Sequence, residues 1–371
     1  MSHRSALAAL GAAGLLLLSG CGGVPTAGPA PGSDQPTAAE AVYAEIGALN
    51  GAERRDRLMQ LAAEEGKKLS IYTSLNADIA DIVVPQFEQA TGIDVDLYRA
   101  DSETVLQRTL QEASAGFAGA DVVETNATQM AIIAEEGLFG TYRSEYRDKV
   151  NEQFHYDAWT PTRFNIFAPA WNTNLVGPNL VPHSWKDLAD PEYDGILSLE
   201  VSDYDWYMTL YTHFRQEGMS DAEIDQLFAD IVKGAKVAKG HSGQVELLSA
   251  GEFGVIAASY TYLTEKARSS GAPVDDKPLV EPVVARANGA GLLRSSQHPA
   301  AAMLFLDWML SDGQKIILEN GLTPSVMPDG SDPLGDLKVL PVDVQQLIDE
   351  GSQWSARYDE VIRGGEQLPE R

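Results

Sequence analysis

The sequence predicts an α/β protein built from two lobes, and three observations support this prediction. Strands alternate with amphipathic helices from residue 67 onward, and the same alternation starts again after Asn165. About 330 of the 371 residues lie beyond the N-terminal segments, which is enough for two lobes of ordinary size. Parallel sheets of this kind bind ligands beyond the carboxyl ends of their strands, so a site is expected there.

Residues 1–20 have the features of a signal peptide. His3 and Arg4 give a basic start, and an apolar run over residues 6–18 follows that is too short to span a membrane. The stretch Leu18-Ser19-Gly20-Cys21 resembles a bacterial lipobox, which implies cleavage before Cys21 and attachment of lipid to its sulfur. Cys21 is the only cysteine, so no disulfide framework is expected. We therefore expect a protein anchored by lipid to the extracytoplasmic face of the cell membrane.

Residues 21–38 are rich in Gly, Pro, Ala, Thr and Ser and poor in large apolar residues. Such a segment cannot bury enough surface to offset its ordering entropy, so we expect a flexible tether. Residues 39–66 are expected to form an N-terminal helical segment ahead of the first lobe.

The charge balance excludes several classes of partner. The chain has 27 basic and 54 acidic residues, which gives a formal net charge of −27. Nucleic-acid phosphates and anionic lipids both attract Lys and Arg, so binding to neither by charge is expected. We interpret the acidity as a contribution to solubility and expect a monomer.

In the first lobe, residues 67–74 predict a strand, and residues 77–90 carry the apolar stripe of a helix that Gly92 closes. Further strands are expected over 93–98 and 120–125, and helices over 102–115 and 128–137. Short polar residues follow the first and third strands. The candidate ligand-binding residues there are Thr73, Ser74, Asn76, Glu124, Thr125 and Asn126.

In the second half of the chain, an apolar extended stretch over residues 166–173 restarts the pattern. Strands are then expected over 195–201, 237–243 and 279–285, and helices over 207–216, 220–233, 244–250, 299–310 and 313–320. The candidate ligand-binding residues here, besides two tyrosines, are Trp171, Asn172, Asp203, Tyr204 and Ser242. Trp171 also suits packing at a hinge, and Ser242 also suits a helix N-cap.

The stretch over residues 252–263 ends in two tyrosines. The apolar run Phe253–Ala258 predicts a strand buried on both faces. On an extended chain Tyr260 and Tyr262 lie on the same face, and Thr261 points the other way. The phenols suit either packing, with a buried ring and a hydrated hydroxyl, or contact with a ligand.

Motifs of common enzyme classes are absent from the sequence. There is no Gly-x-Ser-x-Gly, no His-Glu-x-x-His and no phosphate-binding Gly-x-x-x-x-Gly-Lys-Ser/Thr, and the six histidines show no metal-ligand spacing. A cell-envelope hydrolase with two carboxylates in a cleft is the rival class, but no pair among the 54 acidic residues stands out. We therefore expect a protein that is not an enzyme.

Six short stretches carry a family resemblance by their order and spacing. They are Tyr72-Thr73-Ser74, Ala120-Asp121-Val122-Val123, Trp171-Asn172-Thr173-Asn174-Leu175-Val176, Ser184-Trp185-Lys186-Asp187-Leu188, Gly251-Glu252-Phe253-Gly254-Val255 and Ser259-Tyr260-Thr261-Tyr262-Leu263. Together they resemble the bacterial extracellular solute-binding proteins of ABC importers, and most of all the ferric-iron-binding branch. The similarity runs from about Lys67 to about Asn320.

The resemblance implies a type 2 periplasmic-binding fold, in which two α/β lobes joined by two crossing strands close on a ligand. Lobe 1 would comprise residues 67–163 and 285–371, and lobe 2 residues 164–284. The crossings would fall near Phe164–Asn172 and Pro278–Val284. The protein would capture a small ligand in the cleft and deliver it to an ABC permease in the membrane.

Ferric iron is the first ligand that the resemblance implies, carried as cargo with no further cofactor. Ferric-binding members have two adjacent tyrosines at the end of this strand. Tyr262 matches the second of them and Thr261 the first, while Asn76 and Asn126 match the histidine and glutamate ligands of some members. Tyr262 is therefore the candidate metal ligand, and Tyr260, one position away, is the second. Other tyrosines near strand ends, Tyr72, Tyr204 and Tyr207, offer further phenols.

An organic anion is the alternative ligand. Thr73, Ser74, Thr125, Asn126 and Ser242 are short donors at strand ends and helix starts, where backbone N–H groups and the helix dipole favour anions. A phosphonate, a sugar phosphate or a carboxylate would suit such donors.

Overall fold

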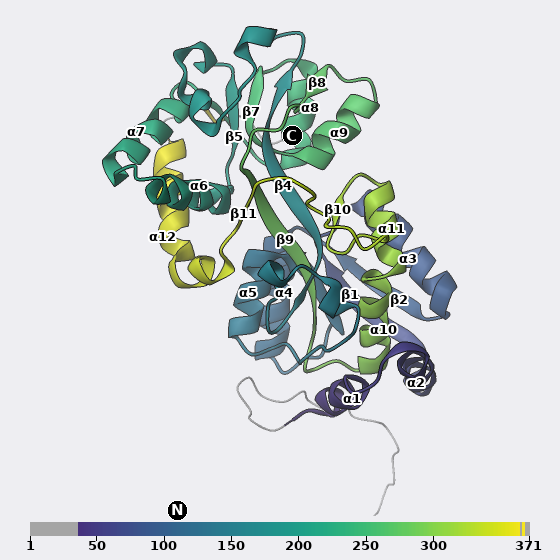
Figure 1. Cartoon of the computed structure of the whole chain (residues 1–371). Helices are drawn as coiled ribbons and strands as arrows, with labels where there is room; N and C mark the ends of the chain where they lie inside the picture. Colours follow the sequence, from purple (N-terminus) through teal and green to yellow (C-terminus); the bar gives the residue numbers. More distant parts are fainter. Residues whose placement is uncertain (1–35, 364–365, 368–371) are drawn as a thin grey trace, which may run out of the picture.

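The computed structural model describes residues 36–363 and 366–367 and shows two lobes stacked one above the other (Figure 1). The expected signal peptide, Cys21 and the tether up to residue 35 lie outside the described residues. Within the described ranges, no helix combines the length and the apolar character needed to cross a membrane.

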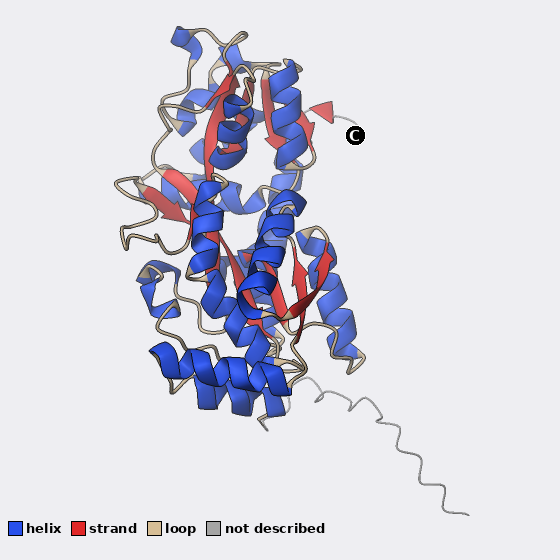
Figure 2. Ribbon diagram, turned by 90° about the vertical axis from the view of Figure 1, so that its right-hand side faces the viewer, coloured by secondary structure: helices blue, strands red, loops and turns tan. Residues whose placement is uncertain are grey.

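One sheet runs through both lobes, with the strand order β12-β6-β5-β7-β4-β9-β3-β1-β2. Lobe 1 contains β1 (Lys68–Thr73) between β2 (Asp94–Arg99) and β3 (Val122–Asn126), all parallel. Its helices are α3 (Ala77–Thr91), α4 (Ser102–Ser114), α5 (Ala127–Glu135), α10 (Pro299–Met309) and α11 (Asp312–Glu319). Figure 2 shows helices on both faces of the sheet, so the predicted α/β alternation is confirmed.

Lobe 2 repeats this arrangement around its own hydrophobic core. Its central strand β5 (Leu197–Glu200) lies parallel to β6 (Lys236–Ala238) and β7 (Val255–Tyr260). Its helices are α6 (Tyr204–Gln216), α7 (Asp221–Val232), α8 (His241–Ala250) and α9 (Thr261–Ser269). The carboxyl ends of these strands face those of lobe 1.

Two long strands, β4 (Thr160–Asn172) and β9 (Val283–Leu292), run antiparallel from one lobe into the other. Every residue of both strands is buried. Along β4, Ile166 packs in the core of lobe 1, and the next residue, Phe167, packs in the core of lobe 2. Two α/β lobes joined by two crossing strands are therefore confirmed. Four short strands complete the sheet: β8 (Val274–Asp275), β10 (Thr323–Pro324), β11 (Val339–Pro341) and β12 (Glu366–Gln367).

The strand that makes the second crossing starts later in the chain than expected. The predicted strand over residues 279–285 is replaced by β9, which starts at Val283, directly after a proline that has no N–H for the ladder. Gly289 and Gly291 obscured the strand in the sequence because glycine is typical of turns. In the structure the rings of Trp159 and Phe139 occupy the space that a side chain at these two positions would need.

The C-terminal helix α12 (Val344–Ile362) packs mainly with lobe 2, although residues 285–371 were expected in lobe 1. Val344 contributes to the core of lobe 1, whereas Leu347, Trp354 and Tyr358 contribute to the core of lobe 2. Figure 1 shows α12 beside α6 and α7. The helix therefore contacts both lobes. Nothing in the sequence indicated that the chain returns to lobe 2 after α11.

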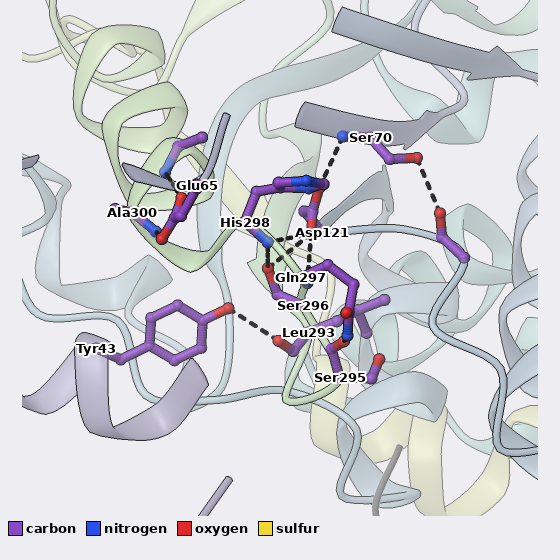
Figure 3. A network of polar contacts seen from close by, with 12 residues as sticks. Tyr43, Glu65, Ser70, Asp121, Leu293, Ser295, Ser296, Gln297, His298 and Ala300 are labelled. Carbon is purple, nitrogen blue, oxygen red and sulfur yellow. Dashed lines mark hydrogen bonds and ion pairs between the residues drawn. The ribbon is translucent and has the colours of Figure 1, made fainter. Parts of the chain in front are cut away.

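The predicted N-terminal helical segment forms two helices, α1 (Ala38–Ile46) and α2 (Gly51–Glu64), on the outer end of lobe 1. Arg54 of α2 donates two hydrogen bonds to the Asp307 carboxylate of α10, at 2.6 and 3.0 Å, and both side chains are buried. After α2, Glu65 accepts hydrogen bonds from the first backbone N–H groups of α10, those of Ala300 and Ala301 (Figure 3).

Asp121 anchors the chain at the amino ends of β1 and β3. Its carboxylate accepts hydrogen bonds from the Ser70 backbone and the Ser296 hydroxyl and contacts the His298 ring at 2.9 Å (Figure 3). Burial alone would raise the pKa of Asp121, but the hydrogen bond and the charge of His298, together with the hydrogen bonds from Ser70 and Ser296, lower it. This network therefore stabilises the end of lobe 1 opposite the strand ends that bear the candidate site.

Candidate functional site

A cleft of about 770 Å³ lies between the lobes, at the carboxyl ends of the parallel strands. Of the candidate residues, seven line this cleft. They are Ser74, Asn76, Asn126, Tyr204, Ser242, Tyr260 and Tyr262. Both lobes contribute to this set, so these residues lie on the cleft that is expected beyond the carboxyl ends of the strands.

The strand that carries the two tyrosines ends earlier than expected. β7 stops at Tyr260, and Thr261 is already the first residue of α9. Tyr260 and Tyr262 therefore do not share a face of one extended strand, and that prediction is wrong. Their rings nevertheless stack, with centroids 6.0 Å apart and planes 16° apart, because the first turn of the helix brings Tyr262 back beside Tyr260.

Tyr262 reaches across the cleft to lobe 1. The side-chain amide of Asn76, at the N-terminus of α3, donates a hydrogen bond of 3.0 Å to the Tyr262 hydroxyl oxygen. Burial raises the pKa of the Tyr262 phenol, and the charge of Arg163 and the bond from Asn76 act in the opposite direction. The hydrogen bond from Asn76 and the charge of Arg163 therefore favour the phenolate, whereas burial and the charge of Asp78 favour the neutral phenol.

Tyr260 is held differently, because its hydroxyl oxygen accepts a hydrogen bond from the buried Arg286 guanidinium. Arg286 also forms an ion pair with Asp205 at 2.8 Å. The His241 ring lies against the Tyr260 ring, with centroids 3.7 Å apart. The Tyr260 oxygen thus already has a cationic partner.

In lobe 1, Glu124 and Thr73 lie behind the cleft wall rather than on it. Glu124 forms a buried ion pair with Arg163 and accepts a hydrogen bond from the Thr73 hydroxyl. Thr125 donates a hydrogen bond of 3.0 Å to the Ser74 hydroxyl and so holds this cleft residue in place. Glu124, Thr73 and Thr125 therefore support the site and do not line it.

Three candidates of lobe 2 also lie off the cleft wall. Asn172 donates to the Leu248 carbonyl at 2.8 Å, and Trp171 is buried in the core, because β4 continues beyond the cleft before it ends. Asp203 is buried behind the wall, where it contacts the His241 ring at 3.0 Å. Burial raises the pKa of Asp203 to about 6.

Several charged residues that line the cleft were not expected from the sequence. These are Arg99, Asp101, Glu103, Arg163, Glu200, Asp205, Lys239, His241 and Arg286. Arg163 and Arg286 could have been recognised from the sequence as candidate site residues, because each lies in a largely apolar stretch that crosses between the lobes. A charge in such a strand is rarely buried without a partner or a role.

Two α/β lobes that are joined by two crossing strands and flank a polar cleft define a solute-binding protein of the type 2 periplasmic-binding fold. The family model described as "Bacterial extracellular solute-binding protein" matches residues 70–316, and the chain belongs to this family. Members of the family are the solute-binding components of ABC importers.

Relatives of known identity agree with this assignment. A "Fe(3+)-binding periplasmic protein" of Serratia marcescens is 24% identical over 303 residues, which cover 77% of this chain and 88% of that protein. Among solved structures, iron-bound HitA from Pseudomonas aeruginosa matches with a TM-score of 0.66 at 19% identity, over 78% of this chain and 99% of HitA. AfuA from Actinobacillus pleuropneumoniae, solved with exogenous fructose-6-phosphate, matches with a TM-score of 0.66 at 20% identity, over 80% and 98% of the chains.

Proposed function

We propose that this solute-binding protein captures ferric iron in the interlobe cleft and delivers it to an ABC permease. The observation that carries the proposal is the position of the Tyr262 hydroxyl, which lies in the cleft opposite Asn76 of the other lobe. A hard trivalent cation favours anionic oxygen, and metal binding stabilises the deprotonated phenol. The ferric-binding relative from Serratia marcescens supports the same ligand.

Tyr262 is the proposed phenolate ligand, and Tyr204 on the same cleft offers a second phenol. Tyr260 takes part only after Arg286 releases its oxygen, because a guanidinium and a ferric ion cannot share that position. The positions that match the family's histidine and glutamate ligands are Asn76 and Asn126, which are neutral, so the donor set differs from that of ferric-binding members.

An organic anion is the second candidate ligand, and the arginines favour it. Arg99, Arg163 and Arg286 all line the cleft, and guanidinium groups bind phosphate and carboxylate through two parallel hydrogen bonds. Ser74, Asn126 and Ser242 would add neutral donors on the same surface. The AfuA structure contains a sugar phosphate, which supports this class of ligand.

An absorption spectrum of the purified protein with added ferric iron separates the two ligands. Phenolate-to-iron charge transfer gives a visible band, and Tyr262→Phe should remove it. Tyr193→Phe is the matched control, because the Tyr193 hydroxyl donates to the Leu180 carbonyl, away from the cleft. If the wild-type protein stays colourless with ferric iron and binds fructose 6-phosphate or a phosphonate in calorimetry, the ligand is an organic anion and the ferric proposal is wrong.

The cellular setting is proposed from the sequence. A lipid on Cys21 would hold the protein at the extracytoplasmic face of the cell membrane, where it would act as a monomer without catalytic activity. Replacement Cys21→Ala should release the protein from the membrane fraction. Membrane fractionation unchanged by Cys21→Ala would contradict the anchor.

A further inference from the structure

Three ligand-type side chains meet on the lobe 2 side of the cleft. Glu200 ends β5, Asp203 immediately precedes α6, and His241 is the first residue of α8, which follows β6. Because β5 and β6 are parallel neighbours, their carboxyl ends lie at the same edge of the sheet. One ligand atom from each of the three residues lies within 4.8 Å of the other two.

Asp203 is buried at the start of a helix but does not cap it. It occupies the N-cap position of α6, yet its side chain accepts no capping hydrogen bond from the helix. The residue is 1% exposed, and its Oδ2 atom has no hydrogen-bond partner. A buried carboxylate oxygen without a partner is costly, so this group is arranged for something other than capping.

The charges around the cluster favour a cation. Three buried carboxylates, those of Glu200, Asp203 and Asp205, face one buried guanidinium, that of Arg286. Arg286 pairs directly with Asp205, and the partner of Asp203 is His241, whose ring nitrogen can bind a metal ion when it is unprotonated. A divalent cation would then match the negative charge of Glu200 and Asp203.

We propose that Glu200, Asp203 and His241 form a binding site for a divalent first-row transition-metal cation in the wall of the cleft. Carboxylate oxygen and imidazole nitrogen together suit Zn²⁺, Mn²⁺ or Fe²⁺. The ion takes one oxygen from each carboxylate and the ring nitrogen of His241 that contacts Asp203, so a proton on that nitrogen leaves to solvent or moves to the other ring nitrogen when the ion binds.

The site opens on the cleft, because Glu200 and His241 line it while Asp203 lies behind them. Three protein ligands leave coordination positions on the cleft side for water or for an oxygen of the solute. Glu200 is already oriented for this role, since the Gly240 N–H donates to its Oε1 at 2.8 Å and Ser202 donates to its Oε2. None of the three residues is a tyrosine, so the site does not depend on the ferric proposal.

Calorimetry with Zn²⁺ on the full chain, freed of metal by a chelator, tests the site. We expect one bound ion per chain, and a loss of affinity of at least about tenfold in both Asp203→Asn and His241→Gln, because even loss of outer-shell partners costs that much. The control is His298→Gln, since His298 also pairs with a buried aspartate, at 2.9 Å, but belongs to no three-ligand group among the described residues. Circular dichroism establishes that each variant is folded, and Glu200→Gln replaces any variant that is not.

Co²⁺ supplies a second readout, because its visible absorption reports the ligands directly. Tyr262→Phe should leave the Co²⁺ spectrum unchanged while it removes the ferric band, which separates this site from the proposed iron site. No Zn²⁺ binding by the wild-type protein would overturn the site and leave the ferric proposal intact. Equal Zn²⁺ affinity in wild type, Asp203→Asn and His241→Gln, or loss of Co²⁺ binding in Tyr262→Phe, would also overturn it.

Discussion

The Asn76 amide and the Tyr262 hydroxyl, 186 positions apart in the chain, form a hydrogen bond across the interlobe cleft. Each side chain lies at the start of a helix, Asn76 at α3 and Tyr262 at α9. The same two helices are also joined by an exposed ion pair between Lys266 and Asp78. These contacts hold the two lobes together on one side of the cleft.

Replacement Asn76→Ala should weaken ligand binding by roughly 2- to 10-fold, because it removes one neutral hydrogen bond worth about 0.5–1.5 kcal/mol. Calorimetry measures the effect, with ferric iron or the organic anion as ligand, whichever the absorption experiment identifies. Small-angle scattering should show a larger radius of gyration for the unliganded variant than for the unliganded wild type. Lys266→Ala is the comparison variant and should change affinity less, since exposed ion pairs contribute about 0–1 kcal/mol. A larger loss in Lys266→Ala than in Asn76→Ala would contradict this ranking.

Replacement Glu124→Gln should lower the free energy of unfolding by about 3–5 kcal/mol, because it leaves the buried Arg163 guanidinium without its counter-charge. Urea unfolding measures the change. Asp221→Asn breaks the exposed pair with Arg215 and serves as the control, with an expected change below about 1 kcal/mol. If Glu124→Gln unfolds like the wild type but loses ligand, Glu124 contacts the ligand after all.

Stability should depend on pH through His298, whose pKa is raised, mainly by its hydrogen bond to Asp121. A raised folded-state pKa gives a stabilisation that is fully present below the unfolded imidazole pKa of about 6.5 and is lost as pH rises through the folded pKa. The stability difference between wild type and His298→Gln should therefore shrink as the pH rises above the unfolded imidazole pKa of about 6.5. The pKa of His241 is also raised, so this difference, and not the wild-type curve alone, is the test. A difference that stays constant or grows with pH would contradict the assignment.

Replacement Gly289→Ala should destabilise the protein by about 1–3 kcal/mol, because the new methyl group overlaps the Trp159 ring and the backbone of β4. Gly177→Ala is the matched control, since that glycine has open space around its Cβ position and no positive φ. Thermal unfolding of both variants measures the effect. Equal melting temperatures of Gly289→Ala and Gly177→Ala would contradict this prediction and would mean that β9 or the Trp159 ring shifts to accommodate the methyl group.

The sequence alone predicted the parts of the fold that depend on local pattern. Alternation of strands and helices follows from side-chain periodicity, so β1, β2 and β3 and their helices were expected near their actual positions. The strand ends then placed Ser74, Asn126 and Ser242 on the cleft correctly. The end of β7 was missed because nothing in Ser-Tyr-Thr-Tyr marks the switch from strand to helix.

Features that depend on partners far away in the chain were not predictable. The Arg163–Glu124 pair joins residues 39 positions apart, and the bond from Arg286 to Tyr260 joins two strands whose register the sequence does not reveal. The cluster of Glu200, Asp203 and His241 likewise forms only when β5 and β6 pair. Contacts between charged residues that are distant in the sequence can be identified only from the three-dimensional structure.

The docking of α1 and α2 on lobe 1 has a mechanical consequence. Everything that precedes Ala38 is attached to the molecule through lobe 1, where Arg54 and Asp307 fasten α2 to α10. If the chain is held at the membrane by its N-terminal end, lobe 1 keeps its position relative to the membrane and lobe 2 moves when a ligand binds. A permease that distinguishes the ligand-bound protein from the free protein would then respond to the position of lobe 2 relative to the bilayer.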